Sequence, residues 1–222
     1  MLRTEGGKTL DPTKGIDPPT VGELISTLLS QESEAIVRVM AFMSYNPSIG
    51  RVLQKGGVAE FQKMAVEKVR RLGNISSVRA FDRFHNKWIE EFTKDIKRND
   101  LRKCSFGQAQ KAINVFLKLY IDWARLPDNA TASKLLPLLH VPLDSILMKT
   151  IAEMFPKFFE SKIKPLRRDN YTHSLSKIGE EEYGAWQTFF RQSYPDRPIL
   201  FDIIWAVKRR PGSRVQRIAA LG

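Results

Sequence analysis

The stretch that decides the fold is Val78–Ile96, which reads VRAFDRFHNKWIEEFTKDI. Apolar and aromatic side chains recur in it every three or four residues, at Val78, Phe81, Phe84, His85, Trp88, Ile89, Phe92 and Ile96. This spacing places them along one side of a helix. Such a stripe is typical of a helix that packs in the centre of an α-helical protein.

The same aromatic stripe would also suit a platform on which nucleic-acid bases stack. Aromatic side chains at helical spacing are more often buried in a core, where each removes a large apolar area from water. We therefore interpret the stripe as core packing. On this interpretation His85 is a core residue whose polar atoms have partners inside the protein.

Similar periodicity predicts helices on both sides of this stretch. Before it we expect helices over 21–30, opened by a Thr20/Glu23 capping box, over 36–45, ended by Asn46-Pro47, and over 58–72. After it we expect helices over 105–125, 144–154, 180–193 and 199–210, with loops over 126–133 and around 162–168. In the helix over 58–72, the cations Lys63, Lys68, Arg70 and Arg71 are expected to face solvent.

No strands alternate with these helices and no internal repeat is present, so the predicted fold is all-α, a compact multi-helix domain. Residues 1–19 are rich in Gly, Pro, Thr and Asp, which predicts a mobile leader. Residues 20–210 are expected to form a single helical domain, with 105–145 as the region where two lobes would meet. Residues 211–222 are expected to form a basic tail.

The charge of the chain favours a polyanionic partner. Lys and Arg number 36 against 24 Asp and Glu among 222 residues, which gives a formal net charge of +12. A positive field of this size favours nucleic acid. A membrane surface is the second choice, and solvated lysine faces without a partner are a third explanation.

Cysteine and histidine usage limits the chemistry. The single cysteine, Cys104, excludes a disulfide within the chain, and the three histidines are spaced too far apart in sequence for a zinc motif. We therefore expect a cytoplasmic protein with no metal site and no cofactor. No apolar run approaches the roughly 18–20 residues of a membrane span, and the polar start lacks the apolar stretch of a secretion signal.

Two segments carry residues suited to chemistry. The first, Gly107-Gln-Ala-Gln-Lys111-Ala-Ile-Asn114, opens a helix on which Lys111, Asn114 and Lys118 share one face. A solvated helix face would show the same pattern. The second segment, Leu138-Leu-His-Val-Pro142-Leu-Asp144, ends on a carboxylate at the expected start of a helix, where helix capping alone would also explain it.

Together the two segments resemble the helix-hairpin-helix DNA glycosylase superfamily, and within it the archaeal 8-oxoguanine glycosylase branch. In that superfamily a catalytic lysine follows a glycine-containing turn, and a Val-Pro-x-Asp segment supplies a catalytic carboxylate. The resemblance covers Gly107 to Leu147, and the chain lacks the family's Gly-x-Gly hairpin and iron–sulfur cysteines.

The resemblance implies a two-lobed helical fold that binds DNA and flips a base into a pocket. Lys111 would attack the sugar carbon, and Asp144 would stabilise the positive charge that develops there. Nucleic acid would be contacted by Gly107, Gln108, Asn114 and Lys118. An extruded base would stack on one of the aromatic residues Trp186, Phe189, Phe190 or Trp205, although each of these also suits a core.

Two basic clusters extend the expected interface. The first comprises Lys162, Lys164, Arg167 and Arg168, and the second comprises Lys208, Arg209, Arg210, Arg214 and Arg217. Such side chains release condensed counterions when they neutralise phosphates. Two alternatives stay open: a non-enzymatic DNA- or RNA-binding module, for example in phage defence, and a protein-interaction domain.

Overall fold

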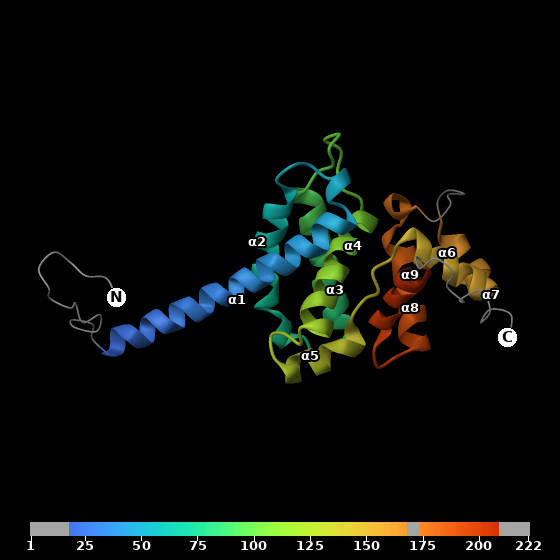
Figure 1. Cartoon of the computed structure of the whole chain (residues 1–222). Coiled ribbons are helices and arrows are strands. Elements are labelled where there is room, and N and C mark those ends of the chain that lie inside the picture. Colours follow the sequence, from blue (N-terminus) through green and yellow to red (C-terminus); the bar gives the residue numbers. More distant parts are fainter. Residues whose placement is uncertain (1–17, 168–173, 209–222) are drawn as a thin grey trace, which may run out of the picture. The chain divides into compact units, whose positions relative to one another are not determined.

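The computed structural model of the chain describes residues 18–167 and 174–208. These residues form helices and contain no β-sheet; their only extended pairings are the isolated bridges Leu53–Arg98 and Lys97–Lys103. The prediction of an all-α fold is confirmed (Figure 1).

The first helix, α1, runs unbroken from Pro18 to Ser48, so the expectation of two helices here was wrong. No glycine or proline lies between Glu23 and Tyr45, and nothing in the sequence therefore interrupts the helix. Two residues assigned to the leader, Pro18 and Pro19, open α1, where proline is tolerated. Residues 1–17 lie outside the described chain. The chain divides between Ile36 and Val37 into two compact units, and the predicted domain bounds stay a prediction.

The second unit begins at Val37 and contains a first core cluster, built from the end of α1, α2 (Gly57–Val69), α3 (Val78–Asp95), α4 (Phe106–Leu117) and α5 (Asn129–Leu135). Ser77 caps α3 by accepting a hydrogen bond from the Ala80 amide at 3.2 Å. The aromatic stripe of α3 is buried: the ring of Phe61 on α2 lies 6.0 Å from Trp88 and 5.4 Å from Phe92. The interpretation of the stripe as core packing is confirmed except at Val78, which is exposed at the helix start, and at Phe84, which is half-buried.

A second core cluster lies beyond Leu139 in sequence and is built on α6 (Ser145–Met154), α7 (Pro156–Phe158) and α8 (Glu180–Ser193). Trp186 and Phe190 of α8 are its largest fully buried side chains. The last described helix, α9, spans Ile203–Lys208. Both clusters belong to the second compact unit, and the division into two lobes stays a prediction.

Short helical segments join these elements. They are of the 3-10 type at Gly50–Val52, Leu72–Asn74, Leu136–Leu138, Lys164–Leu166, Leu175–Lys177 and Pro198–Asp202, and of the π type at Lys118–Trp123 and Phe159–Ile163. Residues 162–166, expected in a loop, are therefore helical. The loop expected over 126–133 contains the start of α5, because Asp128 caps that helix by accepting from the Thr131 amide at 2.9 Å.

One cation of α2 lies in an unexpected place. Lys68, predicted to face solvent, is 2% exposed. Its ammonium group contacts Glu91 of α3 and lies 3.6 Å from Glu67. A buried charge needs such partners, and Glu91 is distant in sequence, so the local pattern did not reveal it.

Among the described helices, none combines the length and apolar character that crossing a membrane requires. Of the predicted C-terminal cluster, Arg209, Arg210, Arg214 and Arg217 lie outside the described residues, as does the basic tail over 211–222.

Candidate functional site

The site begins at the first turn of α4. Ser105 and Gln108 form a capping box there: the Ser105 hydroxyl accepts from the Gln108 amide at 3.3 Å, and Gln108 Oε1 accepts from the Ser105 amide at 3.0 Å. Gly107 packs so closely that a Cβ at this position would lie 1.9 Å from the carbonyl oxygen of Leu175. Only glycine therefore fits this turn without a shift of the backbone. Lys111 follows one turn later.

Lys111 and Asp144 meet in the folded chain. Lys111 Nζ lies 2.8 Å from Asp144 Oδ2, and the side chains are 12% and 19% exposed. The other oxygen, Asp144 Oδ1, accepts a hydrogen bond from the Leu147 amide at 2.8 Å. Asp144 is thus the N-cap of α6, as predicted, and its second oxygen remains available to the lysine.

Two glutamine side chains hold Asp144 beside α4. The buried segment before it, Leu139–Leu143, has no regular structure, so its backbone groups need side-chain partners. Gln110 of α4 accepts from the Leu143 amide at 3.2 Å and donates to the Leu143 carbonyl at 3.1 Å. Gln187 of α8 pairs in the same way with Val141, at 2.8 and 2.9 Å. Their fixed geometry places Asp144 next to Lys111.

A second ion pair lies near the first. Lys118 Nζ contacts Asp202 Oδ2 at 2.7 Å, and their side chains are 13% and 4% exposed. The same ammonium group lies 5.0 Å from the centre of the Trp123 ring, a cation–π distance. Trp123 itself is 65% exposed, which is unusual for so large an apolar side chain.

The two ion pairs, Lys111–Asp144 and Lys118–Asp202, and the ring of Trp123 line one pocket of about 620 Å³. Its polar wall is formed by the two ion pairs and by Arg51. Its apolar wall consists of Met43, Pro47, Val115, Leu119, Trp123, Ile146 and Leu175. A hollow with apolar walls and a few converging charged groups is typical of ligand-binding sites, which span about 300–1,000 Å³.

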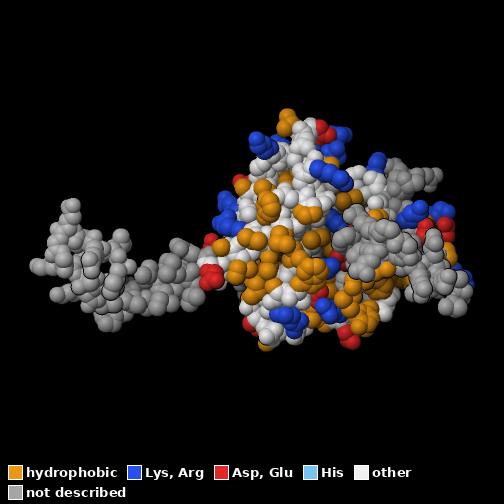
Figure 2. All heavy atoms as spheres, in the orientation of Figure 1, with side chains coloured by type: hydrophobic (Ala, Val, Ile, Leu, Met, Phe, Trp, Pro, Cys, Tyr) orange, Lys and Arg blue, Asp and Glu red, His pale blue; other side chains and the backbone are white. Residues whose placement is uncertain are grey.

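The apolar wall continues onto the molecular surface. The part of α1 that belongs to the second unit exposes Val39, Phe42 and Met43, which lie three and four residues apart on one face of the helix. Figure 2 shows apolar side chains gathered on the surface in the region where this part of α1 lies. Met43 also lines the pocket, so an apolar strip leads into the site.

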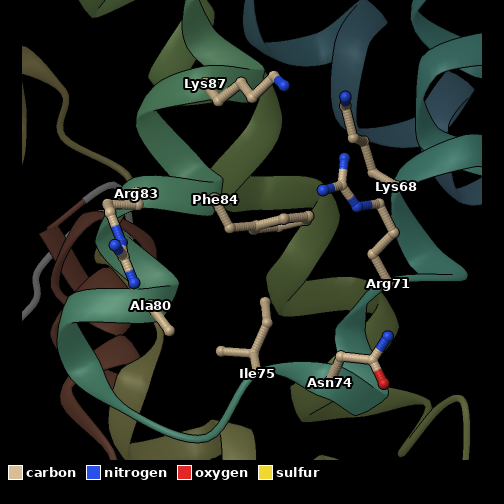
Figure 3. Close-up of a pocket in the computed structure, with 8 residues that line it drawn as sticks. All are labelled: Lys68, Arg71, Asn74, Ile75, Ala80, Arg83, Phe84 and Lys87. Atoms are coloured by element: carbon tan, nitrogen blue, oxygen red, sulfur yellow. The ribbon is translucent and has the colours of Figure 1, made fainter.

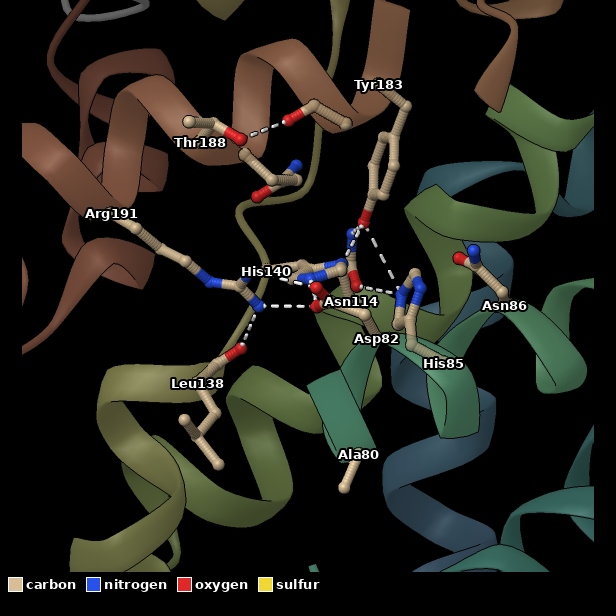
Figure 4. A network of polar contacts seen from close by, with 12 residues as sticks. Ala80, Asp82, His85, Asn86, Asn114, Leu138, His140, Tyr183, Thr188 and Arg191 are labelled. Carbon is tan, nitrogen blue, oxygen red and sulfur yellow. Dashed lines mark hydrogen bonds and ion pairs between the residues drawn. The ribbon is translucent and has the colours of Figure 1, made fainter. Parts of the chain in front are cut away.

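A buried polar network includes Asn114, which lies on the same helix as Lys111 (Figure 4). Asn114 of α4 is its centre, because its Nδ2 donates to the Tyr183 hydroxyl at 2.8 Å and its Oδ1 lies 2.6 Å from His85 Nε2. The Tyr183 hydroxyl lies 2.8 Å from His140 Nδ1, and His140 Nε2 lies 2.8 Å from Asp82 Oδ1. Arg191 also contacts that oxygen, at 2.7 Å.

The network fixes where its hydrogen atoms lie. Because the Asp82 carboxylate only accepts, His140 Nε2 donates to it, and His140 Nδ1 accepts from Tyr183. His85 Nε2 likewise donates to Asn114 Oδ1. Neutral rings, each with one N–H, fit these roles. His85 Nδ1 has no hydrogen-bond partner among the described residues, so the prediction that the polar atoms of His85 have internal partners holds only at Nε2.

Burial accounts for this neutrality. It lowers the pKa of His140 to about 4, although the hydrogen bond to Asp82 acts in the opposite direction. Burial also lowers the pKa of His85 well below its usual range, and the neighbouring His140 adds to this effect. Burial would raise the pKa of Asp82, but hydrogen bonds from His140 and Arg191 outweigh it and leave that pKa well below its usual range.

The structure brings together only part of the predicted interface. Lys111, Asp144 and Lys118 line the pocket, whereas Gly107, Gln108 and Asn114 are buried. The Asn114 amide is fully committed to internal hydrogen bonds, so contact with nucleic acid is not its role. The shared helix face predicted for Lys111, Asn114 and Lys118 was wrong at Asn114, which points into the core.

The first basic cluster is largely occupied by internal contacts. Lys162 is exposed, Lys164 pairs with Glu160 at 2.7 Å, and Arg167 pairs with Glu182 at 3.2 Å. Arg168 lies outside the described residues. Of the candidate stacking residues, Trp186 and Phe190 are fully buried and Phe189 is half-buried. The side chain of Trp205 is not among those described.

Sequence reasoning missed Trp123, Asp202 and Gln110 as site residues. Trp123 was counted among the apolar residues of its helix, and its exposure follows only from the tertiary fold. Asp202 is 84 positions from Lys118, so no local pattern could link them. Within the described ranges, no group of three or more His, Cys, Asp or Glu side chains is placed to hold a metal ion.

The resemblance to helix-hairpin-helix glycosylases depends on the residues between Gly107 and Leu147, which include both members of the Lys111–Asp144 pair. The chain matched no protein-family model, no curated protein and no solved structure.

Proposed function

We propose that the chain binds DNA at the Lys111 pocket and excises a base there, as a glycosylase with lyase activity. The observation that carries this proposal is the Lys111 Nζ–Asp144 Oδ2 contact of 2.8 Å inside a pocket of about 620 Å³. An amine and a carboxylate at this distance are the two groups such a reaction requires. The pocket has room for a nucleotide that has left the base stack.

The proposed reaction uses this pair in three steps. Lys111 first passes a proton to Asp144 Oδ2, which frees the lone pair on Nζ. Nζ then forms a bond to C1′ of the sugar, and the electron pair of the broken glycosidic bond leaves with the base. The base takes up the proton from Asp144, so that an ionised carboxylate faces the positive charge now on Nζ. The lyase activity follows these steps: Nζ gives one proton to Asp144, the C1′–O4′ bond breaks, and O4′ takes up that proton, which leaves a protonated imine between Nζ and C1′. Removal of a C2′ proton by Asp144 then expels the 3′ phosphate.

The remaining pocket residues suit binding of the strand. Trp123 offers an exposed ring, which favours stacking of an unpaired base. Arg51 and Lys118 lie on the polar wall, where a phosphate would be attracted. A net charge of +12 favours association with a polyanion.

We expect replacement of Trp123 with alanine to weaken binding of a single-stranded oligonucleotide about 5- to 150-fold, because stacking on an aromatic ring contributes about 1–3 kcal/mol per base. Fluorescence anisotropy of a labelled strand measures the change. Tyr194→Ala is the matched control, since Tyr194 is 46% exposed but does not line the pocket. Equal affinities of the wild-type and Trp123→Ala proteins would exclude this surface as the binding site.

A separate assay tests the excision step. We expect incision of duplexes that contain 8-oxoguanine, uracil or an abasic site, and a loss of at least about 1,000-fold with Lys111→Arg, which keeps the positive charge but removes the nucleophilic amine. Lys149→Ala, on the exposed face of α6, is the control. Electrophoresis of the labelled duplexes measures the rate. Equal rates for Lys111→Arg and wild type would contradict the assignment of Lys111.

A second candidate function is nucleic-acid binding without catalysis. It is favoured by the observation that both pocket lysines already pair with carboxylates, as in structural ion pairs. On this alternative, binding would show a steep dependence on salt concentration, and no duplex would be incised.

A further inference from the structure

A second pocket, of about 320 Å³, lies between the end of α2 and the first half of α3 (Figure 3). It shares no lining residue with the Lys111 pocket. Four of its eight lining residues are cations and none is acidic: Lys68, Arg71, Arg83 and Lys87 accompany Asn74, Ile75, Ala80 and Phe84. The pocket therefore favours an anionic ligand.

Three of the four cations form no ion pair with another described residue. Lys68 is buried, and its charge is offset by Glu91 and Glu67. Arg71, Arg83 and Lys87 are exposed, and none of them takes part in the ion pairs found among the described residues. A phosphate oxygen could contact these groups without displacing an internal partner.

The pocket also offers a flat apolar surface. Figure 3 shows the Phe84 ring projecting toward Arg71, with the side chains of Lys68 and Lys87 on one side of it and Ile75 on the other. Phe84 is half-buried, and its ring packs edge to face against Trp88 with the centres 5.9 Å apart. That contact fixes the ring from the core side and leaves part of it facing the pocket.

We propose that this pocket binds a nucleotide, with its planar base against Phe84 and its phosphates against Arg71 and Lys87. Guanidinium and ammonium groups form charge-assisted hydrogen bonds with phosphate oxygens, and bases of any kind stack on aromatic rings. The nucleotide is either free or the phosphorylated end of a strand. The proposal depends on neither Lys111 nor Asp144, so it stands or falls independently of the excision reaction.

Isothermal titration calorimetry of the full chain tests the proposal with four probes: ATP, tripolyphosphate, adenosine and a 5′-phosphorylated oligonucleotide. We expect ATP to bind more tightly than tripolyphosphate or adenosine, because only ATP carries both the phosphates and the base. Arg71→Ala and Lys87→Ala should each raise the Kd for ATP at least tenfold. Phe84→Leu should weaken ATP binding and leave tripolyphosphate binding unchanged.

Lys94→Ala is the matched control for Lys87→Ala, because Lys94 is exposed on the same helix but does not line the pocket. If Lys94→Ala weakens ATP binding as much as Lys87→Ala, the attraction is non-specific and the proposal is overturned. Failure of both ATP and the phosphorylated strand to bind would also overturn it. If Phe84→Leu does not fold, the charge reversal Arg71→Glu at the exposed rim replaces it. If the phosphorylated strand binds more tightly than ATP, and Arg71→Ala abolishes this binding, the site is supported and its ligand is the end of a strand rather than a free nucleotide.

Discussion

Replacement of Asn114 with alanine is expected to lower the free energy of unfolding by about 4 kcal/mol, because each buried polar group left without a partner costs about 1–3 kcal/mol and a cavity adds to the loss. Asn114 is fully buried and contacts His85 at 2.6 Å and Tyr183 at 2.8 Å. Its removal would leave the His85 N–H without an acceptor and deprive the Tyr183 oxygen of its donor. Urea unfolding followed by circular dichroism measures the change.

Asn99→Ala is the control for this substitution. Asn99 lies outside the network and donates to the Arg51 carbonyl at 2.9 Å, but this hydrogen bond is exposed, so water can replace it. We expect a loss below about 1 kcal/mol there. A comparable loss for the two variants would contradict the account of Asn114 as the centre of a buried network.

Acid should destabilise the protein well before its carboxylates titrate. The pKa of His140 is about 4 in the folded chain, against about 6.5 in an unfolded one. Between these values the unfolded chain binds the additional proton, so the stability that is present above pH 6.5 is lost as the pH falls toward 4. One histidine with this shift accounts for about 3 kcal/mol by pH 4, and His85 adds a loss of the same sign.

Urea unfolding at pH 7.5, 6, 5 and 4 measures this loss. The pKa of Asp82 is depressed in the folded chain, so the stability that this carboxylate contributes is lost only when the pH falls below about 4, the ordinary pKa of an Asp side chain. The decline between pH 6.5 and 4 therefore belongs to the histidines. His140→Gln, which removes one titrating group, should show a shallower decline. A free energy of unfolding that is the same at pH 5 and pH 7.5 would contradict the neutral, buried state of both rings.

Periodicity along the sequence predicted the helices that have strong apolar stripes. The ring stripe of α3 and the apolar positions of α4, α6 and α8 fit one helical face each, and α3, α6 and α8 lie close to their predicted bounds. The helix predicted over 105–125 is α-helical only to Leu117 and continues as the π-helix Lys118–Trp123. Periodicity did not predict helices correctly where the local sequence lacks a clear apolar pattern. The short polar helix α5 resembles a loop in composition, and the charged residues Glu32 and Glu34 in α1 interrupt the apolar pattern but not the helix.

Sequence motifs predicted the pair at the centre of the candidate site but not the residues that hold it in place. Lys111 and Asp144 were paired because two short segments resembled a known arrangement, and the structure places their side chains 2.8 Å apart. Gln110 and Gln187 were not found, because their partners are backbone groups of a segment that has no regular structure. Lys68 was assigned to solvent since its position on the helix gave no sign of Glu91 across the interface.

Borohydride trapping tests the central claim most directly. The purified protein is mixed with duplexes that contain 8-oxoguanine, uracil or an abasic site, and the reductant converts any imine between Lys111 Nζ and C1′ to a stable amine. We predict a covalent protein–DNA adduct that is absent with Lys111→Arg and reduced with Asp144→Asn, which preserves the helix cap but removes the charge. No adduct on any of these duplexes, despite salt-sensitive DNA binding, would contradict the lyase assignment and leave a binding protein.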